Sequence, residues 1–224
     1  MTPVRSAAHR DGRRPAAPIR RAFAVAVIAA ALAACSSKPP ATATGEATPE
    51  QVQGMVHVCS SCHGKGGHSI SPTFPRLAGQ QAGYLEAQLK AFHDHTRADP
   101  HALTYMWGMA AQLTDPLITG IATYYSMQTP VPGTPQDPGE MAAGQRIFVE
   151  GLPDRDVPAC QGCHGEKAEG MDAIPRLAGQ HREYLDEQLR NFASNARANE
   201  VMHANALPLN PTEISAITAY LAAQ

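Results

Sequence analysis

The stretch Cys59-Ser60-Ser61-Cys62-His63 occurs a second time as Cys160-Gln161-Gly162-Cys163-His164. Two cysteines separated by two residues and followed at once by a histidine are the pattern by which proteins attach c-type haem. In such a motif the two thiols form thioethers with the haem vinyl groups, and the histidine ligates the iron. The repeated pentapeptide therefore predicts two covalently bound haem c groups, one for each copy.

Other chemistries use part of this motif. A Cys-x-x-Cys pair alone occurs in redox dithiols and in zinc sites. A dithiol does not need the histidine, and a zinc site needs a second Cys or His pair, whereas each half of the chain has one Cys-x-x-Cys. A single match can arise by chance, but two matches at equivalent places of a repeat favour haem attachment.

Residues 1–34 are predicted to be a signal peptide. Six arginines precede an apolar run from Ala22 to Ala34, and these 13 residues are too few to cross a bilayer as a helix. The run ends in Leu32-Ala33-Ala34-Cys35, which resembles the lipobox of bacterial lipoproteins. We expect lipidation at Cys35, the alternative being ordinary cleavage next to a spare thiol. Residues 35–47 should then be a flexible tether.

Cysteine count and charge agree with an exported protein. The chain has five cysteines, so the two haem motifs and Cys35 use all of them and leave none for a disulfide. Without residues 1–34, which hold six arginines and one aspartate, 12 basic and 19 acidic residues remain, a net charge near −7. An acidic chain of this kind has no electrostatic footprint for nucleic acid.

The two halves of the chain are an internal repeat. Pro75-Arg76-Leu77-Ala78-Gly79-Gln80 recurs intact as Pro175-Arg176-Leu177-Ala178-Gly179-Gln180. Behind each copy, five residues recur at a spacing that places them on one face of a helix. They are Tyr84, Leu85, Gln88, Leu89 and Phe92 in the first half and Tyr184, Leu185, Gln188, Leu189 and Phe192 in the second, followed by Arg97-Ala98 and Arg197-Ala198.

The repeat predicts an all-α chain of two tandem helical domains, each wrapped around one haem. The first domain covers residues 48–128 and the second covers residues 139–224, and a stiff Pro-rich linker at 129–138 separates them. Both have few aromatics, so the haem would complete each core. The first helix should begin near Thr48 and the last helices at Thr114 and Asn210, each with a cap and an early proline.

The chain resembles the two-haem cytochrome c4 family over nearly all of residues 48–224. The two haem motifs, the Pro-Arg-Leu-Ala-Gly-Gln segments and the spacing behind them carry this resemblance. It implies two class I cytochrome c domains, an exported electron carrier, and a methionine before the last helix as the second iron ligand. Both irons are then filled, so we expect no enzyme activity and no small-molecule substrate.

The repeat helps to choose these methionines. In the first half Met106 and Met109 compete for the iron. Met202 lies seven residues before Leu209, and Met106 lies seven residues before Leu113. We therefore predict His63 with Met106 and His164 with Met202 as the two ligand pairs.

Histidine ligation is the rival to methionine. His101 and His203 lie close to the chosen methionines, but they do not occupy equivalent positions in the repeat. The other histidines are expected to face solvent, and the tyrosines that begin the repeated helices are expected in the core. These residues are His68, His93, His95 and His181, and Tyr84 and Tyr184.

The resemblance also assigns roles around the haem. Pro75 and Pro175 lie 12 and 11 residues after the motif histidines. Class I cytochromes use a proline there to offer a backbone carbonyl to the proximal histidine; the alternative is a proline that only starts a helix. Arg76 and Arg176 are candidates to pair with haem propionates, the alternative being exposed arginines.

The predicted function is transfer of single electrons between respiratory partners, by a lipid-anchored shuttle that delivers them to a terminal oxidase or another reductase. A second hypothesis is an electron-transfer subunit docked permanently on a dehydrogenase. A third is a haem enzyme such as a thiosulfate dehydrogenase, which needs an open iron site. We expect a location on the periplasmic side, with the outer membrane favoured because Ser36 is not a retention aspartate.

Overall fold

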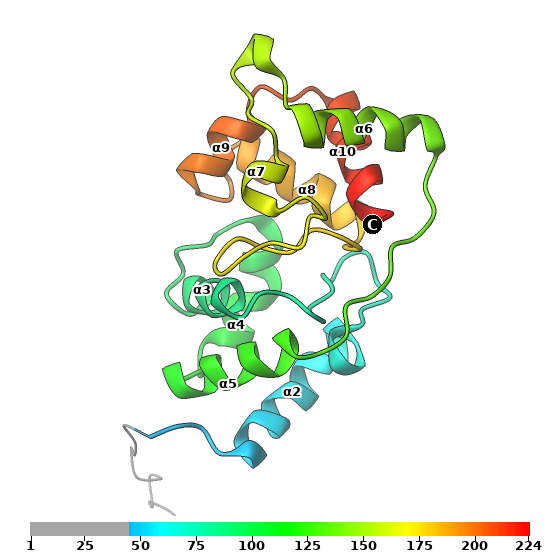
Figure 1. Ribbon diagram of the computed structural model, residues 1–224. Coiled ribbons are helices and arrows are strands. Elements are labelled where there is room, and N and C mark those ends of the chain that lie inside the picture. The colour runs from blue at the N-terminus through cyan, green and yellow to red at the C-terminus, as the bar shows by residue number, and fades with distance from the viewer. Residues whose placement is uncertain (1–44) are drawn as a thin grey trace, which may run out of the picture. The chain divides into compact units, whose positions relative to one another are not determined.

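The computed structural model describes residues 45–224, which fall within one compact unit. Within this range the only strand-like features are two isolated β-bridges, Leu152 with Val157 and Met171 with Ile174. The helices form two groups in Figure 1, one from each half of the chain. The prediction of an all-α chain with two tandem helical halves is confirmed. The predicted signal peptide, Cys35 and most of the predicted tether lie outside the described residues.

The first half contains four α-helices and two short helical turns. They are α2 (Pro49–His63), the 3₁₀ turn η2 (Lys65–Gly67), α3 (Ala82–His93), the π-helical turn η3 (Ala102–Met106), α4 (Trp107–Ala110) and α5 (Asp115–Ser126).

The second half contains five α-helices and one short helical turn. Its elements are α6 (Pro138–Glu150), the 3₁₀ turn η4 (Pro153–Arg155), α7 (Gln161–His164), α8 (Arg182–Ala193), α9 (Glu200–Ala206) and α10 (Pro211–Ala222).

Reciprocal side-chain caps begin α2 and α10. Thr48 accepts a hydrogen bond from the Gln51 backbone, and the Gln51 side chain accepts one from the Thr48 backbone. Asn210 and Glu213 form the same capping box, which satisfies backbone donors that have no partner inside the helix. α5 begins after Thr114 as predicted, but the Thr114 side chain makes no capping hydrogen bond.

The haem motifs occupy different settings in the two halves. Cys59 to His63 form the last turn of the long helix α2, whereas Cys160 to His164 are separated from α6 by a loop that contains η4. Gly64 ends the first motif with φ 76°, and Gly165 ends the second with φ 83°. A Cβ at Gly64 would lie 2.6 Å from His68 O, so the chain turns here because this residue has no side chain.

The first and last helices of each half cross at close range. In the second half a Cβ added at Gly144 of α6 would lie 2.0 Å from Ala216 O of α10. In the first half a Cβ added at Gly120 of α5 would lie 2.5 Å from Val52 Cγ2 of α2. Gly120 and Ala216 are equivalent in the repeat, so the glycine that permits the crossing lies on opposite partners in the two halves.

Each half has its own apolar core, and the linker lies against the folded chain. The first core includes Phe92, Ile118 and Tyr125, and the second includes Phe148 and Ile217. The linker forms no helix before α6 begins at Pro138, and Thr134 N donates to Ala222 O at 2.8 Å. In residues 45–224 none of the helices combines the length and the apolar composition that crossing a bilayer requires.

Candidate functional site

A cavity of about 840 Å³ lies between the helices and is lined by both halves of the chain. This volume is within the range of small-molecule and cofactor sites. Apolar side chains from the repeated helices, such as Leu85 and Leu185, form much of its wall. The predicted haem-attaching and iron-binding residues among its lining are Cys59, His63 and Met106 from the first half and Cys160, Cys163, His164 and Met202 from the second; the other residues predicted to surround the haems, Pro75, Arg76, Pro175 and Arg176, line it too.

The two motif histidines are held by equivalent backbone contacts. His63 is 8% exposed, and its Nδ1 lies 2.9 Å from Pro75 O. His164 is 7% exposed, and its Nδ1 lies 3.2 Å from Pro175 O. A carbonyl oxygen only accepts, so each Nδ1 carries the proton and each Nε2 keeps a lone pair for a metal. Burial lowers the pKa of both histidines, which favours the neutral, ligating form.

The cysteines of each motif differ in exposure. Cys59 and Cys160 are half-buried in the cavity wall, whereas Cys62 and Cys163 are exposed. Burial raises the pKa of Cys59 and Cys160, so both are protonated thiols at neutral pH. Of the two exposed cysteines, Cys163 lines the cavity and Cys62 does not.

The first half brings Met106 to the cavity through an unusual turn. Met106 is half-buried and ends the π-helical turn η3, whereas Met109 is 41% exposed and does not line the cavity. Met106 lies nine positions after Arg97, whereas Met202 lies only five positions after the equivalent Arg197. The π-helical turn η3 overlaps this four-residue insertion, and such turns are common near functional sites.

The second half brings Met202 to the cavity on α9. Asn199 caps this helix, accepting a hydrogen bond from Met202 N at 2.9 Å. The rival histidines have other partners. His101 lines the cavity, but its Nδ1 lies 3.0 Å from a carboxylate oxygen of Glu187. His203 does not line the cavity, and its Nδ1 donates to a backbone carbonyl of α8 at 2.7 Å.

The two arginines proposed for the haem propionates have different surroundings. The Arg76 guanidinium donates to Gly179 O in the other half. Both arginines line the cavity, but within the described residues only the buried Nε of Arg176 has no hydrogen-bond partner. A buried donor needs an acceptor, and a propionate carboxylate in the cavity would supply one. The residues present therefore fit a haem, most clearly at Arg176.

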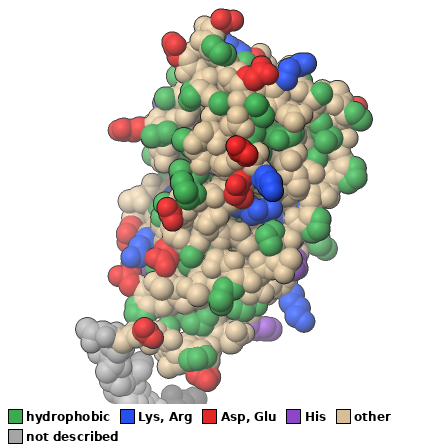
Figure 2. Space-filling model, in the orientation of Figure 1, with side chains coloured by type: hydrophobic (Ala, Val, Ile, Leu, Met, Phe, Trp, Pro, Cys, Tyr) green, Lys and Arg blue, Asp and Glu red, His purple; other side chains and the backbone are tan. Residues whose placement is uncertain are grey.

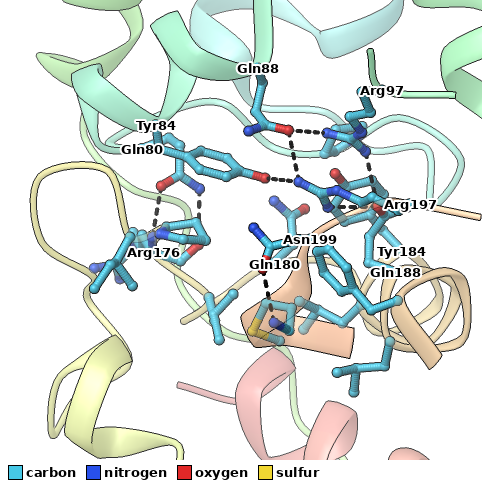
Figure 3. Close-up of a pocket in the computed structure, with 18 of the residues that line it drawn as sticks. Gln80, Tyr84, Gln88, Arg97, Arg176, Gln180, Tyr184, Gln188, Arg197 and Asn199 are labelled. Atoms are coloured by element: carbon cyan, nitrogen blue, oxygen red, sulfur yellow. Dashed lines mark hydrogen bonds between the residues drawn. The ribbon is translucent and has the colours of Figure 1, made fainter. Parts of the chain in front are cut away.

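A hydrogen-bonded group of side chains joins the halves beside the cavity, as Figure 3 shows. Arg197 donates to Tyr84 Oη at 2.9 Å and to Gln88 Oε1 at 2.8 Å. Arg97 donates to the same Gln88 oxygen at 2.8 Å and to Gln188 Oε1 at 2.9 Å. We call these five residues the interface cluster. Three of them come from the first half and two from the second.

A carboxylate completes the cluster on one side only. Arg97 Nε donates to Asp99 Oδ2 at 2.7 Å, and the Asp99 side chain is fully buried. The equivalent residue in the second half is Asn199, which caps α9 instead. Burial by itself raises the pKa of Tyr84, but the positive charges of Arg197 and Arg97 outweigh it and lower that pKa.

Two predictions about single residues are wrong. Tyr84 is expected in the core, but it is half-buried at the contact between the halves, where its hydroxyl accepts a hydrogen bond from Arg197. His181 was expected to face solvent, but it is half-buried, and its Nε2 donates to Ser69 O in the other half at 3.0 Å. In both positions the partner lies in the other half of the chain.

Comparison with known proteins gives consistent matches. A family model described as cytochrome c matches residues 55–125 and 141–224. Cytochrome c4 of Stutzerimonas stutzeri is 36% identical over 192 residues, which cover 81% of this chain and 90% of that protein. The thiosulfate dehydrogenase electron acceptor of Thiomonas intermedia is 34% identical over 218 residues, covering 92% of both. The solved structure of Acidithiobacillus ferrooxidans cytochrome c4 matches with a TM-score of 0.71 at 38% identity, covering 74% of this chain and 98% of that one.

The chain belongs to the cytochrome c family, as a two-haem protein of the cytochrome c4 type. The predicted family, the predicted pair of class I cytochrome c domains and the predicted pair of covalent haem c groups are therefore confirmed. Electron transfer is the function that this membership supports.

Sequence reasoning missed the polar residues that join the two halves of this cytochrome. Gln80 and Gln180 end the repeated hexapeptides, and Gln88 and Gln188 lie on the repeated helices. A polar residue that recurs at matched positions among recurring apolar residues was the available signal. The role of such a residue can be inferred only when its hydrogen-bond partner is known, and that partner lies in the other half of the chain.

Proposed function

We propose that this cytochrome carries single electrons between respiratory protein partners outside the cytoplasmic membrane, delivering them to a terminal oxidase or another reductase. One observation supports this most directly. Each half brings one histidine and one methionine to the same cavity, His63 with Met106 and His164 with Met202. A His/Met pair fills both axial positions of a haem iron, which suits electron transfer rather than substrate binding.

The proposed roles follow from the site. Cys59 and Cys62 would attach the first haem, and Cys160 and Cys163 the second. When bound, haem c supplies an iron that cycles between the ferrous and ferric states. The chain holds the ligands still during this cycle, because the carbonyls of Pro75 and Pro175 orient the proximal imidazoles. Arg176 would donate to a propionate through its unpartnered Nε, and Arg76 would do so alongside its bond to the other half.

The proposed location is the periplasmic side of a membrane, with a lipid on Cys35 as the anchor. The sequence Leu32-Ala33-Ala34-Cys35 after a short apolar run supports this. The outer membrane is favoured because Ser36 follows the cysteine. On the face shown in Figure 2, acidic side chains are scattered over the surface with apolar side chains between them. Redox partners with basic docking surfaces would complement this charge.

Spectroscopy of the purified protein tests the carrier proposal. A pyridine haemochrome assay should count two haems per chain, and acid-acetone should extract none. The oxidised protein should show the weak near-infrared sulfur-to-iron band of His/Met haems, and the ferrous protein should not bind carbon monoxide. Ready carbon monoxide binding by the wild type would reveal an open iron. It would replace the carrier proposal with a haem enzyme such as a thiosulfate dehydrogenase.

The second candidate is an electron-transfer subunit docked permanently on a dehydrogenase. The similarity to a thiosulfate dehydrogenase electron acceptor over 92% of this chain favours it. Gentle purification from the native membrane, followed by size-exclusion chromatography and mass spectrometry, separates the two. A free shuttle elutes alone, whereas a docked subunit elutes with a large partner at a fixed ratio.

A further inference from the structure

One peptide group in the first half contacts the proximal histidine on one side and the second half on the other. Pro75 O accepts a hydrogen bond from His63 Nδ1 at 2.9 Å. The N–H of Arg76 belongs to the same peptide group, and it donates to Gln180 Oε1 at 2.8 Å. A continuous chain of two hydrogen bonds and one peptide therefore leads from a glutamine of the second half to the imidazole of the first.

The same arrangement occurs in reverse. Pro175 O accepts from His164 Nδ1 at 3.2 Å, and Arg176 N donates to Gln80 Oε1 at 2.7 Å. Figure 3 shows Gln80 reaching Arg176 across the contact. Each half thus supplies the glutamine that contacts the histidine-binding peptide of the other.

Both glutamines are buried and held in one orientation. Gln80 is 6% exposed and Gln180 is 7% exposed. The Nε2 groups donate back, from Gln180 to Arg76 O at 2.9 Å and from Gln80 to Arg176 O at 2.9 Å. This pairing fixes which end of each amide faces the peptide N–H. Away from water, such hydrogen bonds are stronger and polarise one another.

We propose that Gln180 and Gln80 are positioning residues that tune the redox potential of the haem in the opposite half. The proposal rests on the proposed role of His63 and His164 as iron ligands. A peptide is a resonance-delocalised group, so an acceptor at its N–H increases the negative charge on its carbonyl oxygen. That oxygen then binds the Nδ1–H of the histidine more strongly, and the imidazole becomes a better electron donor to a metal. Stronger donation stabilises the ferric state and lowers the potential.

The two hydrogen-bonded chains from glutamine to histidine differ in length. The histidine-to-carbonyl distance is 2.9 Å in the first half and 3.2 Å in the second. The shorter hydrogen bond responds more to polarisation of its acceptor, so the glutamine of the second half should exert the larger effect. These hydrogen-bonded chains therefore also contribute to a difference in redox potential between the two haems.

Leucine substitutions test the crossed pattern. Gln180→Leu should raise the midpoint potential of the haem on the first motif, and Gln80→Leu should raise that of the haem on the second. Spectroelectrochemical titration gives both potentials, and proton NMR of the axial methionine methyl groups assigns them. The Nδ1–H resonance of His63 in the reduced protein should move in Gln180→Leu, while that of His164 stays in place.

A neighbouring residue provides the matched control. Gln81 Nε2 donates to Glu169 O of the other half at 2.9 Å, but Gln81 does not bind the N–H of a histidine-binding peptide. Gln81→Leu removes a contact between the halves, so it should leave both potentials unchanged. Gln180→Glu keeps an acceptor for Arg76 N and makes it stronger, so it should lower the first potential, opposite in sign to Gln180→Leu. The glutamate variant also serves if the leucine variant does not retain its haems.

Three results would overturn the proposal: no shift, equal shifts of both haems, or a shift confined to the glutamine's own half. Equal shifts would mean that the glutamines only hold the halves together. The wild-type protein is measured first, and absence of two His/Met haem signals there would refute the proposed function instead. The two failures are therefore distinguishable.

Discussion

Asp99 and Asn199 occupy equivalent positions of the repeat, but one is a carboxylate and the other an amide, and their roles differ. Both follow the repeated Arg-Ala pair, yet Asp99 binds the buried Arg97 guanidinium and Asn199 caps α9. A carboxylate carries the charge that a buried guanidinium needs, whereas an amide does not. The two residues therefore contribute to stability by different amounts.

Removal of the Asp99 carboxylate should be the more costly change. Asp99→Ala leaves the buried Arg97 without its counter-charge, and we expect a loss of about 3–5 kcal/mol in the free energy of unfolding. Asn199→Ala removes only a helix cap, at a cost of about 1 kcal/mol. Guanidinium denaturation followed by far-ultraviolet circular dichroism measures both. Equal losses would show that Arg97 does not depend on its carboxylate.

The choice between two methionines is also made at the scale of the residue. Met106 lines the cavity and Met109 is exposed outside it. Met106→Leu should therefore open the first iron to carbon monoxide and remove half of the near-infrared band. Met109→Leu should leave the spectrum almost unchanged. Loss of the band in the Met109 variant would transfer the ligand role to that residue.

At the scale of the element, two helical glycines should respond with opposite signs to the same substitution. Gly144 of α6 lies against the backbone of α10, and an added Cβ would meet Ala216 O. Gly54 of α2 is exposed, with no atom within 4 Å of an added Cβ. The crossing of α6 and α10 therefore requires a glycine at position 144, whereas nothing in the packing requires one at position 54.

Gly144→Ala should destabilise the protein by roughly 1–3 kcal/mol, because α6 and α10 must separate to admit the methyl group. Gly54→Ala should stabilise it by roughly 0.5–1 kcal/mol, because alanine loses less backbone entropy in a helix. Thermal melts of the two variants beside the wild type give the comparison. A stabilising effect of Gly144→Ala would mean that the crossing is looser than described.

At the scale of the whole molecule, the contact between the halves should respond to pH. His181 Nε2 donates to Ser69 O, and burial together with the positive charge of Arg76 lowers the pKa of His181. Below about pH 6.5 the unfolded chain therefore binds a proton more readily than the folded chain does. The contribution of neutral His181 is fully present above that pH and is lost as the pH falls toward the folded pKa.

His181→Gln should accordingly reduce the drop in melting temperature between pH 7.5 and pH 5.5. The glutamine does not titrate, so it removes one group that favours unfolding in acid. His57→Gln on the exposed face of α2 is the matched change, and it should leave the drop as in the wild type. A drop that is unchanged in the His181 variant would assign the acid sensitivity to other groups.

Membrane attachment is a second prediction at this scale. Cys35→Ala should release the protein into the soluble exported fraction, because the proposed lipid would no longer be added. Fractionation after a high-salt wash, with immunoblotting, measures the distribution. If the variant stays with the membrane, the anchor is not at Cys35.

The sequence by itself determined the two haem motifs, the repeat and the all-α class. These features depend on residues that are close in the chain: Cys59 and Cys62 are one helical turn apart, and a capping box such as Thr48 with Gln51 spans three residues. The spacing of such residues along the chain is enough to indicate how they lie, so the family and the cofactor could be predicted before any contact was known.

Only the tertiary structure decided which polar residues join the two halves. Gln180 binds the peptide N–H of Arg76, 104 positions earlier, and Arg197 binds Tyr84, 113 positions earlier. The repeat showed that these residues recur, but not whether each faces its own core, solvent or the other half. Packing of one half on the other selects the partner, because a buried polar group must find a hydrogen bond wherever the fold supplies one.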